Sequence, residues 1–75
     1  MTREEEAIRV FDEANLLCQA GEPLRALRAY EKAIELKPDL FAVWHGKGVA
    51  LFCLGRLGEA REAWERARQL HPKGL

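Results

Sequence analysis

The sequence predicts an all-α domain of four antiparallel helices, arranged as two tandem helical hairpins. Apolar residues recur at helical spacing, and no stretch of the 75 residues alternates polar and apolar residues as a strand does. Glycine and proline interrupt the helical pattern at short intervals, which favours short connections between antiparallel neighbours. These interruptions are themselves repeated, since Gly21 and Gly55 stand 34 residues apart.

The first helix is predicted by its N-terminal residues. Thr2 and Glu5 fit a capping box, in which each side chain accepts a hydrogen bond from the backbone N–H of the other residue. Acidic residues fill the first turn, where the helix dipole favours negative charge. We expect this helix to run to about Gln19 and to stop at Gly21.

The second helix lies between two prolines. Pro23 suits the first helical turn, because the N–H that proline lacks would find no partner inside the helix at that position. The helix should continue to about Lys37. Pro38 then ends it, because proline biases the preceding residue away from helical geometry.

The third helix is the most apolar stretch of the chain. Asp39 can act as its N-cap, and we expect the helix to span about 40–54, with Gly55 as the break. Because it is apolar on most sides, it should lie in the middle of the fold with partners on both sides. A fourth helix follows over about 58–70, and Pro72 closes it.

Helix breakers, small residues and large apolar residues recur 34 positions apart along the chain. Small residues recur where two helices must approach closely, and large ones recur where side chains fill the remaining gap. The matched pairs are Val10 and Trp44, Ala14 and Gly48, Leu17 and Leu51, Gly21 and Gly55, Ala26 and Ala60, Tyr30 and Trp64, Ala33 and Ala67, and Pro38 and Pro72.

This pattern resembles the tetratricopeptide repeat (TPR), whose motif runs W-x2-L-G-x2-Y, then A-x3-F, then A, then P. The second repeat, about 41–74, carries most of the motif, although Lys47 stands where the family prefers leucine. The first repeat, about 7–40, matches best in its second half. The matching residues are Gly21, Ala26, Tyr30, Ala33 and Pro38, and then Trp44, Gly48, Leu51, Gly55, Leu57, Ala60, Trp64, Ala67 and Pro72. The resemblance implies one TPR domain over 1–75, with its two hairpins stacked as a short right-handed solenoid.

Matched positions differ in polarity at the two ends of the predicted stack. Residues of the second helix that should face the next repeat become polar or small in the fourth helix: Leu24, Leu27 and Ile34 become Gly58, Arg61 and Arg68. Arg9 and Glu13 stand where the third helix has Val43 and Lys47, and they can pair on an exposed face. We therefore expect a self-contained two-repeat unit. Because arginine stems can also cover apolar surface, a third repeat in a longer parent chain stays open.

In the TPR family, the first helix of each repeat lines a concave surface that binds an extended or helical peptide. Most residues at these positions are apolar here, which favours an amphipathic helix of a partner protein or a second copy of the chain as occupant. The clamp that binds acidic chaperone C-termini is matched only at Asn15, because Phe11 and Gly46 replace its lysine and second asparagine. The predicted groove residues are Ile8, Phe11, Asp12, Asn15, Cys18, Gln19, Ala42, His45, Gly46, Val49, Phe52 and Cys53.

Different groove residues have different expected roles. Hydrogen bonds from Asn15 and His45 would orient the bound segment. Gly46 costs about 1 kcal/mol relative to alanine inside a helix, so either a close backbone approach requires it or the helix tolerates it. The expected apolar anchors are Ile8, Phe11, Val49 and Phe52.

Other function classes fit the sequence less well. Twelve basic and twelve acidic residues give zero net charge, and no basic stretch dominates, which argues against nucleic acid as partner. The polar cluster of Asp12, Asn15 and His45 lacks a nucleophile and an oxyanion donor set, so we expect no enzyme activity and no cofactor. A zinc site at His45, Cys18 and Cys53 is an alternative, although free cysteine is usually a small buried hydrophobe.

Two further expectations concern location and assembly. The acidic N-terminus has no apolar signal core, and Lys47 interrupts the most apolar run, so we expect a cytoplasmic protein without a membrane span. The remaining alternative function is a structural solenoid unit that pairs through its end helices, with Arg61 and Arg68 in the interface.

Overall fold

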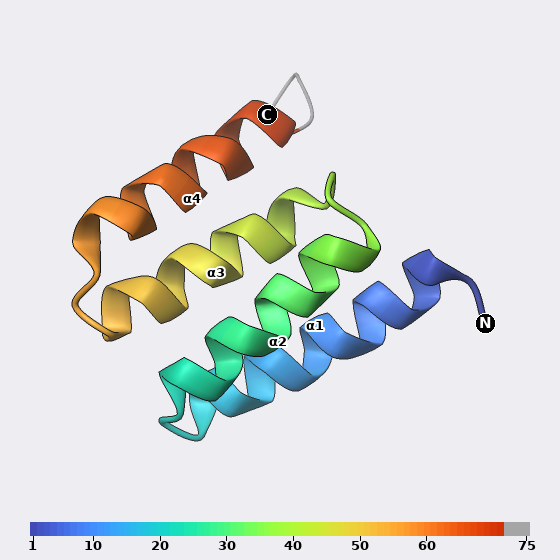
Figure 1. Ribbon diagram of the computed structural model, residues 1–75, viewed down its shortest axis with the longest axis horizontal. Helices are drawn as coiled ribbons and strands as arrows, with labels where there is room; N and C mark the ends of the chain where they lie inside the picture. The colour runs from blue at the N-terminus through green and yellow to red at the C-terminus, as the bar shows by residue number, and fades with distance from the viewer. Residues whose placement is uncertain (72–75) are drawn as a thin grey trace.

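The structure, a computed structural model, describes residues 1–71 and contains four α-helices in that range (Figure 1). They are α1 (Arg3–Gln19), α2 (Pro23–Leu36), α3 (Phe41–Cys53) and α4 (Leu57–Leu70). One antiparallel hairpin consists of α1 and α2, the other of α3 and α4, and α2 packs against α3 to join them. The predicted all-α fold of four helices in two hairpins is therefore confirmed.

The start of α1 has the predicted capping box. The Glu5 backbone N–H donates to Oγ1 of Thr2 at 3.1 Å, and the Thr2 backbone N–H donates to Oε1 of Glu5 at 2.8 Å. These two bonds satisfy N–H groups that have no carbonyl partner at a helix start.

The two hairpin turns share one geometry. Gly21 and Gly55 both have φ of 79°, the left-handed region that glycine enters without steric cost. After α1, the N–H of Glu22 donates to the carbonyl of Leu17 at 2.9 Å, and after α3 the matched N–H of Arg56 donates to Leu51 at 2.9 Å. This pattern closes the last helical turn in a Schellman motif, which explains the repeated glycine.

The predicted cap of α3 is wrong. The helix begins at Phe41 with Leu40 as its N-cap residue, and no side chain caps it. The Asp39 carboxylate lies one residue too early and pairs instead with Lys37, with 3.1 Å between Nζ and Oδ1. Pro72, the predicted end of α4, lies outside the described residues.

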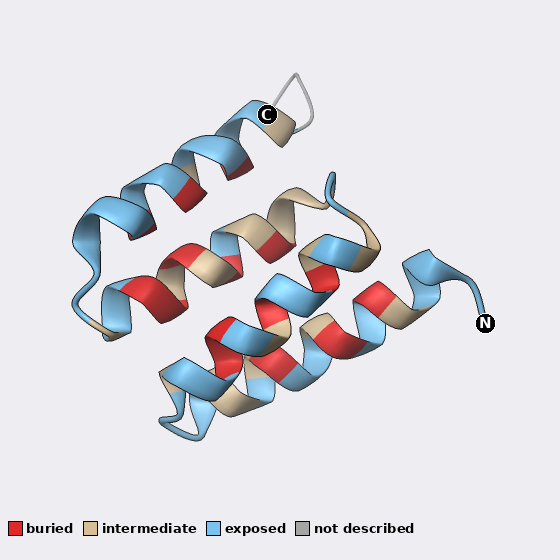
Figure 2. Cartoon of the chain, viewed as in Figure 1, coloured by how far each residue is buried: buried red, intermediate tan, exposed pale blue. Residues whose placement is uncertain are grey.

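The core lies along the faces where the four helices meet, as the red segments in Figure 2 show. It is rich in alanine, so helix backbones approach closely and a few large side chains fill the remaining space. Tyr30, Val43 and Leu51 are the largest side chains that are fully buried. The central position of α3 between α2 and α4 is as predicted, but its second apolar face is open, because Phe52 is 57% exposed.

The end faces of the stack are polar. Arg9 and Glu13 form the predicted pair on the exposed side of α1, with 3.2 Å between Nη1 and Oε2. On α4, Arg61 and Arg68 are exposed, and Arg68 pairs with Glu65 at 2.7 Å. None of the helices within residues 1–71 is long and apolar enough to span a bilayer.

Candidate functional site

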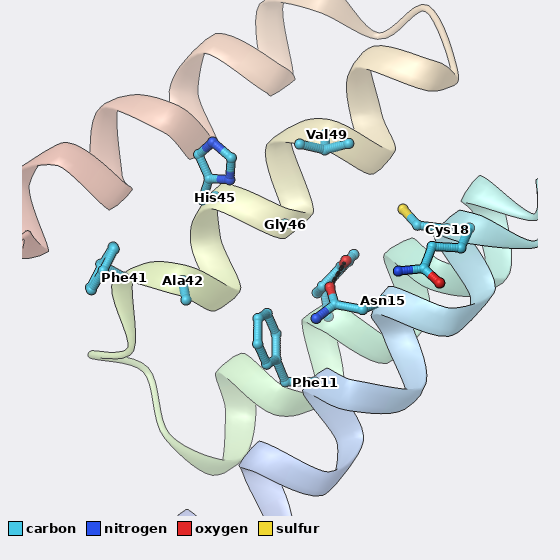
Figure 3. Close-up of a pocket in the computed structure, with 10 residues that line it drawn as sticks. Phe11, Asn15, Cys18, Phe41, Ala42, His45, Gly46 and Val49 are labelled. Atoms are coloured by element: carbon cyan, nitrogen blue, oxygen red, sulfur yellow. Dashed lines mark hydrogen bonds between the residues drawn. The ribbon is translucent and has the colours of Figure 1, made fainter.

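A cavity of about 390 Å³ lies between α1 and α3, on the open side of the two hairpins (Figure 3). Residues from three helices line it: Phe11, Asn15, Cys18 and Gln19 from α1, Tyr30 from α2, and Phe41, Ala42, His45, Gly46 and Val49 from α3. No Asp, Glu, Lys or Arg is among the described residues that line it. The cavity is therefore mostly apolar, with a few polar groups at defined positions.

The structure brings most of the predicted groove residues together around this cavity. Those that line it are Phe11, Asn15, Cys18, Gln19, Ala42, His45, Gly46 and Val49. Those that do not are Ile8, Asp12, Phe52 and Cys53, all of which are exposed. On α1 and on α3, only the side that faces the other helix borders the cavity. The prediction had included residues from both sides of each helix. Cys18 thus lines the cavity, and its counterpart Phe52 lies on the outer side of α3.

Two cavity residues were absent from the prediction. Phe41 is the first residue of α3 and directly precedes a predicted groove residue. Tyr30 lies on α2, a second helix of a hairpin, where large residues were assigned to the core. The sequence signal that could have found Tyr30 is Gly46, because a β-carbon at position 46 would overlap the Tyr30 ring.

Asn15 is held in place by Tyr30. The Tyr30 hydroxyl donates to Oδ1 of Asn15 at 2.5 Å. Burial, and then the neighbouring Cys18, raise the pKa of this hydroxyl well above its ordinary value, because the charged form is disfavoured inside the fold. The bond directs the carbonyl end of the Asn15 amide at Tyr30. Within residues 1–71 the NH2 group at the other end has no hydrogen-bond partner and is available to a ligand.

An aromatic rim lies beside the cavity, where α3 meets α4. The His45 ring is exposed, with its centroid 6.5 Å from that of Trp64, and the Phe52 ring lies 6.0 Å from Trp64 on the same helix pair. The Trp64 indole donates to the backbone carbonyl of His45 at 3.2 Å. This bond fixes the indole against α3, so the aromatic rim belongs to the packed structure.

The lysine that follows Gly46 in the chain interacts outside the cavity. Lys47 lies with Nζ 5.3 Å from the centroid of the Trp44 ring and 3.7 Å from the Glu31 carboxylate on α2. Among residues 1–71, no lysine or arginine lines the cavity, so none of them offers a counter-ion to an acidic C-terminus there. No group of three His, Cys, Asp or Glu side chains in 1–71 is placed to hold a metal ion, so nothing there supports the zinc alternative.

Comparison with known proteins gives two matches. A sequence model of the tetratricopeptide repeat family matches residues 11–74. An uncharacterized protein of Methanocaldococcus jannaschii is 46% identical over 46 residues, which cover 61% of this chain and 54% of that protein. The matched part of this chain thus spans about half the length of that curated relative.

Proposed function

Because this chain belongs to the tetratricopeptide repeat family, whose members are generally protein–protein interaction modules, we propose that the groove between α1 and α3 binds a segment of a partner protein. The proposed role is non-catalytic. The observation that carries it is the uncharged cavity with one asparagine held ready to donate. Ligand sites of this kind combine apolar walls with a few polar groups that fix orientation.

The apolar part of the ligand would contact aromatic side chains. Phe11 packs against Tyr30, with 6.0 Å between ring centroids. Phe41 borders the cavity from α3, and its ring centroid lies 4.5 Å from that of His71. Val49 extends the apolar wall along α3. The proposed anchors are therefore Phe11, Phe41 and Val49, while Ile8 and Phe52 lie outside the cavity. A segment without charged side chains at its centre fits this lining, because no Asp, Glu, Lys or Arg of residues 1–71 lines the cavity to neutralise a buried charge.

Asn15 would orient the bound segment. Its NH2 group is available to donate to a backbone carbonyl of the ligand, because the bond from Tyr30 occupies its carbonyl oxygen. A donor that is already fixed loses little side-chain entropy on binding. The exposed His45 ring, on the opposite wall, is the second proposed hydrogen-bonding group.

The test begins with peptides selected against the chain from a random library displayed on phage. Titration calorimetry then gives the dissociation constant of each peptide for the wild type, Phe11→Ala and Asn15→Ala. We expect each substitution to weaken binding at least about tenfold, which corresponds to roughly 1.4 kcal/mol. Arg66→Ala is the control, because Arg66 is exposed on α4 away from the cavity, and it should bind as the wild type does.

Two outcomes would contradict the proposal. Peptides that bind Phe11→Ala and Asn15→Ala as tightly as the wild type would show that the interface lies elsewhere. A selection that returns no binding peptide would show that the groove does not bind peptides. A second copy of the chain is the alternative occupant of the groove. In that case sedimentation of the wild type alone would show a dimer that Phe11→Ala dissociates.

A further inference from the structure

The contacts between α2 and α3 define the register in which one hairpin stacks on the next. The repeat interval of 34 residues relates α2 to α4 and α1 to α3. The face of α2 that contacts α3 therefore corresponds to the outer face of α4, and the face of α3 that contacts α2 corresponds to the outer face of α1. We propose that these two end faces prevent copies of this chain from stacking end to end in that register. The inference concerns surfaces outside the groove and does not depend on the proposed function.

The first obstacle is a pair of like charges. Between the hairpins, Lys47 on α3 pairs with Glu31 on α2 at 3.7 Å. The residues 34 positions away are Glu13 on α1 and Glu65 on α4. In an end-to-end stack, two carboxylates would replace the Lys–Glu pair, and each is already paired with an arginine of its own helix. The stack would thus lose the attraction that joins the two hairpins at this position.

The second obstacle is steric. The Tyr30 ring of α2 packs so closely on Gly46 of α3 that a β-carbon at position 46 would overlap the ring. The residues at the matched positions are Trp64, whose ring system is larger, and Asp12, which has both a β-carbon and a charge. The close approach that joins the two hairpins is therefore closed to a second copy.

The third obstacle is the burial of arginine. Leu27 on α2 is 3% exposed because the second hairpin covers it. Its counterpart on α4, Arg61, is exposed. Val43 is 1% exposed, and its counterpart Arg9 on α1 is also exposed, which is the same relationship at the other end. Stacking in this register would bury both guanidinium groups. Arg9 would keep its ion pairs with Glu6 and Glu13, but Arg61 has no ion pair within residues 1–71, and burying a charge without a partner is strongly unfavourable.

A fourth position adds bulk to the α1 face. Ala50 on α3 is completely buried, and its counterpart on α1 is Leu16, which is 64% exposed. A leucine where the interface accommodates only alanine would overpack it. Because end-to-end contacts do not close, they generate filaments rather than finite oligomers. The four differences therefore act together to keep the unit from polymerising.

The test restores each face separately. One variant carries Arg9→Val, Asp12→Gly, Glu13→Lys and Leu16→Ala on the α1 face, and the other carries Arg61→Leu and Arg68→Ile on the α4 face. Circular dichroism checks that both fold. In sedimentation equilibrium we expect an equimolar mixture to form a 1:1 complex at least about tenfold tighter than any association of either variant alone or with the wild type.

A matched control isolates the steric obstacle. The α1-face variant with Asp12→Ala in place of Asp12→Gly keeps the β-carbon, and its mixture with the α4-face variant should bind at least about tenfold more weakly. A mixture of the two folded variants that forms no complex would overturn the proposal. The proposal would also be overturned if the wild-type chain formed oligomers that grow with concentration and that Arg61→Glu dissociates. This second result is measured without the two variants described above. A groove-mediated dimer would not be confused with such growth, because Phe11→Ala dissociates only the former.

Discussion

The ring of Tyr30 on α2 lies directly against the backbone of Gly46 on α3, so closely that a β-carbon on the glycine would overlap the ring. This contact accounts for a glycine that costs helix stability at its position. Tyr30 is 2% exposed, and its hydroxyl donates to Asn15 in the groove. The same side chain therefore packs the two hairpins together and positions a polar group of the candidate site. Gly48 and Trp64 have the same relationship within the second hairpin.

Gly46→Ala should destabilise the fold although alanine is the better helix former. Overpacking costs about 1–3 kcal/mol, and a β-carbon that overlaps a buried ring favours the upper part of this range. That cost exceeds the roughly 1 kcal/mol gained in helix propensity. Urea unfolding followed by circular dichroism measures the difference. The control is Gly58→Ala on α4, where a β-carbon meets nothing within 4 Å, and it should raise the unfolding free energy by about 0.5–1 kcal/mol. Equal stability of Gly46→Ala and the wild type would contradict the steric role of the ring.

Tyr30→Phe should lower both stability and groove affinity. The substitution removes only the hydroxyl that donates to Asn15, so the unfolding free energy should fall by about 0.5–1.5 kcal/mol while the ring packing stays. Affinity for a selected peptide should fall as well, because the Asn15 amide is no longer held. In a double-mutant cycle, Tyr30→Phe should then add little to Asn15→Ala. Fully additive losses in peptide affinity would show that the two residues act independently.

Ionisation of Tyr30 should couple to unfolding in alkaline solution. Burial, and then Cys18, raise the pKa of Tyr30 above the ordinary value of 10.0, because the charged form is disfavoured inside the fold. Below about pH 10 the hydroxyl is protonated in both states, so this contribution to stability is fully present. Above that pH the unfolded chain loses its proton first, and stability falls as the pH rises toward the folded-state pKa.

The measurement is clean because Tyr30 is the single tyrosine of the chain. Ultraviolet absorbance of the tyrosinate should rise together with the loss of helical circular dichroism, rather than before it. Tyr30→Phe should remove this part of the alkaline destabilisation, and the difference between the two proteins corrects for lysine and arginine. Tyrosinate that forms at the ordinary pKa while the helices stay intact would show that the hydroxyl is accessible to solvent.

Thr2→Ala should destabilise the start of α1 by about 1 kcal/mol, because the Glu5 backbone N–H loses its acceptor. Thr2→Ser keeps the hydroxyl and should be close to the wild type. Thermal unfolding of the two variants distinguishes the cap from a general effect of changing the residue. If both variants melt alike, the hydroxyl contributes nothing to the helix.

The sequence by itself determined the helices, the turns and the repeat. These features depend on contacts within about one helical turn, such as the capping box at Thr2 and the left-handed glycine at Gly21, and local contacts can be read from neighbouring residues. Asp39 was assigned wrongly by the same method, because the residue type suits a cap while the helix begins too late for its side chain to reach. The repeat itself was visible because both hairpins meet the same packing demand at the same interval.

Only the tertiary structure decided which sides of α1 and α3 face each other and which ring lies on Gly46. Those relationships depend on the crossing of helices that are far apart in the chain, and residue spacing within one helix does not specify that crossing. For this reason the predicted groove residues on the facing sides border the cavity, while Phe52, which was assigned to the groove, lies outside the cavity. Tyr30 went unrecognised as part of the site, because its place there depends on how α2 packs beneath α3.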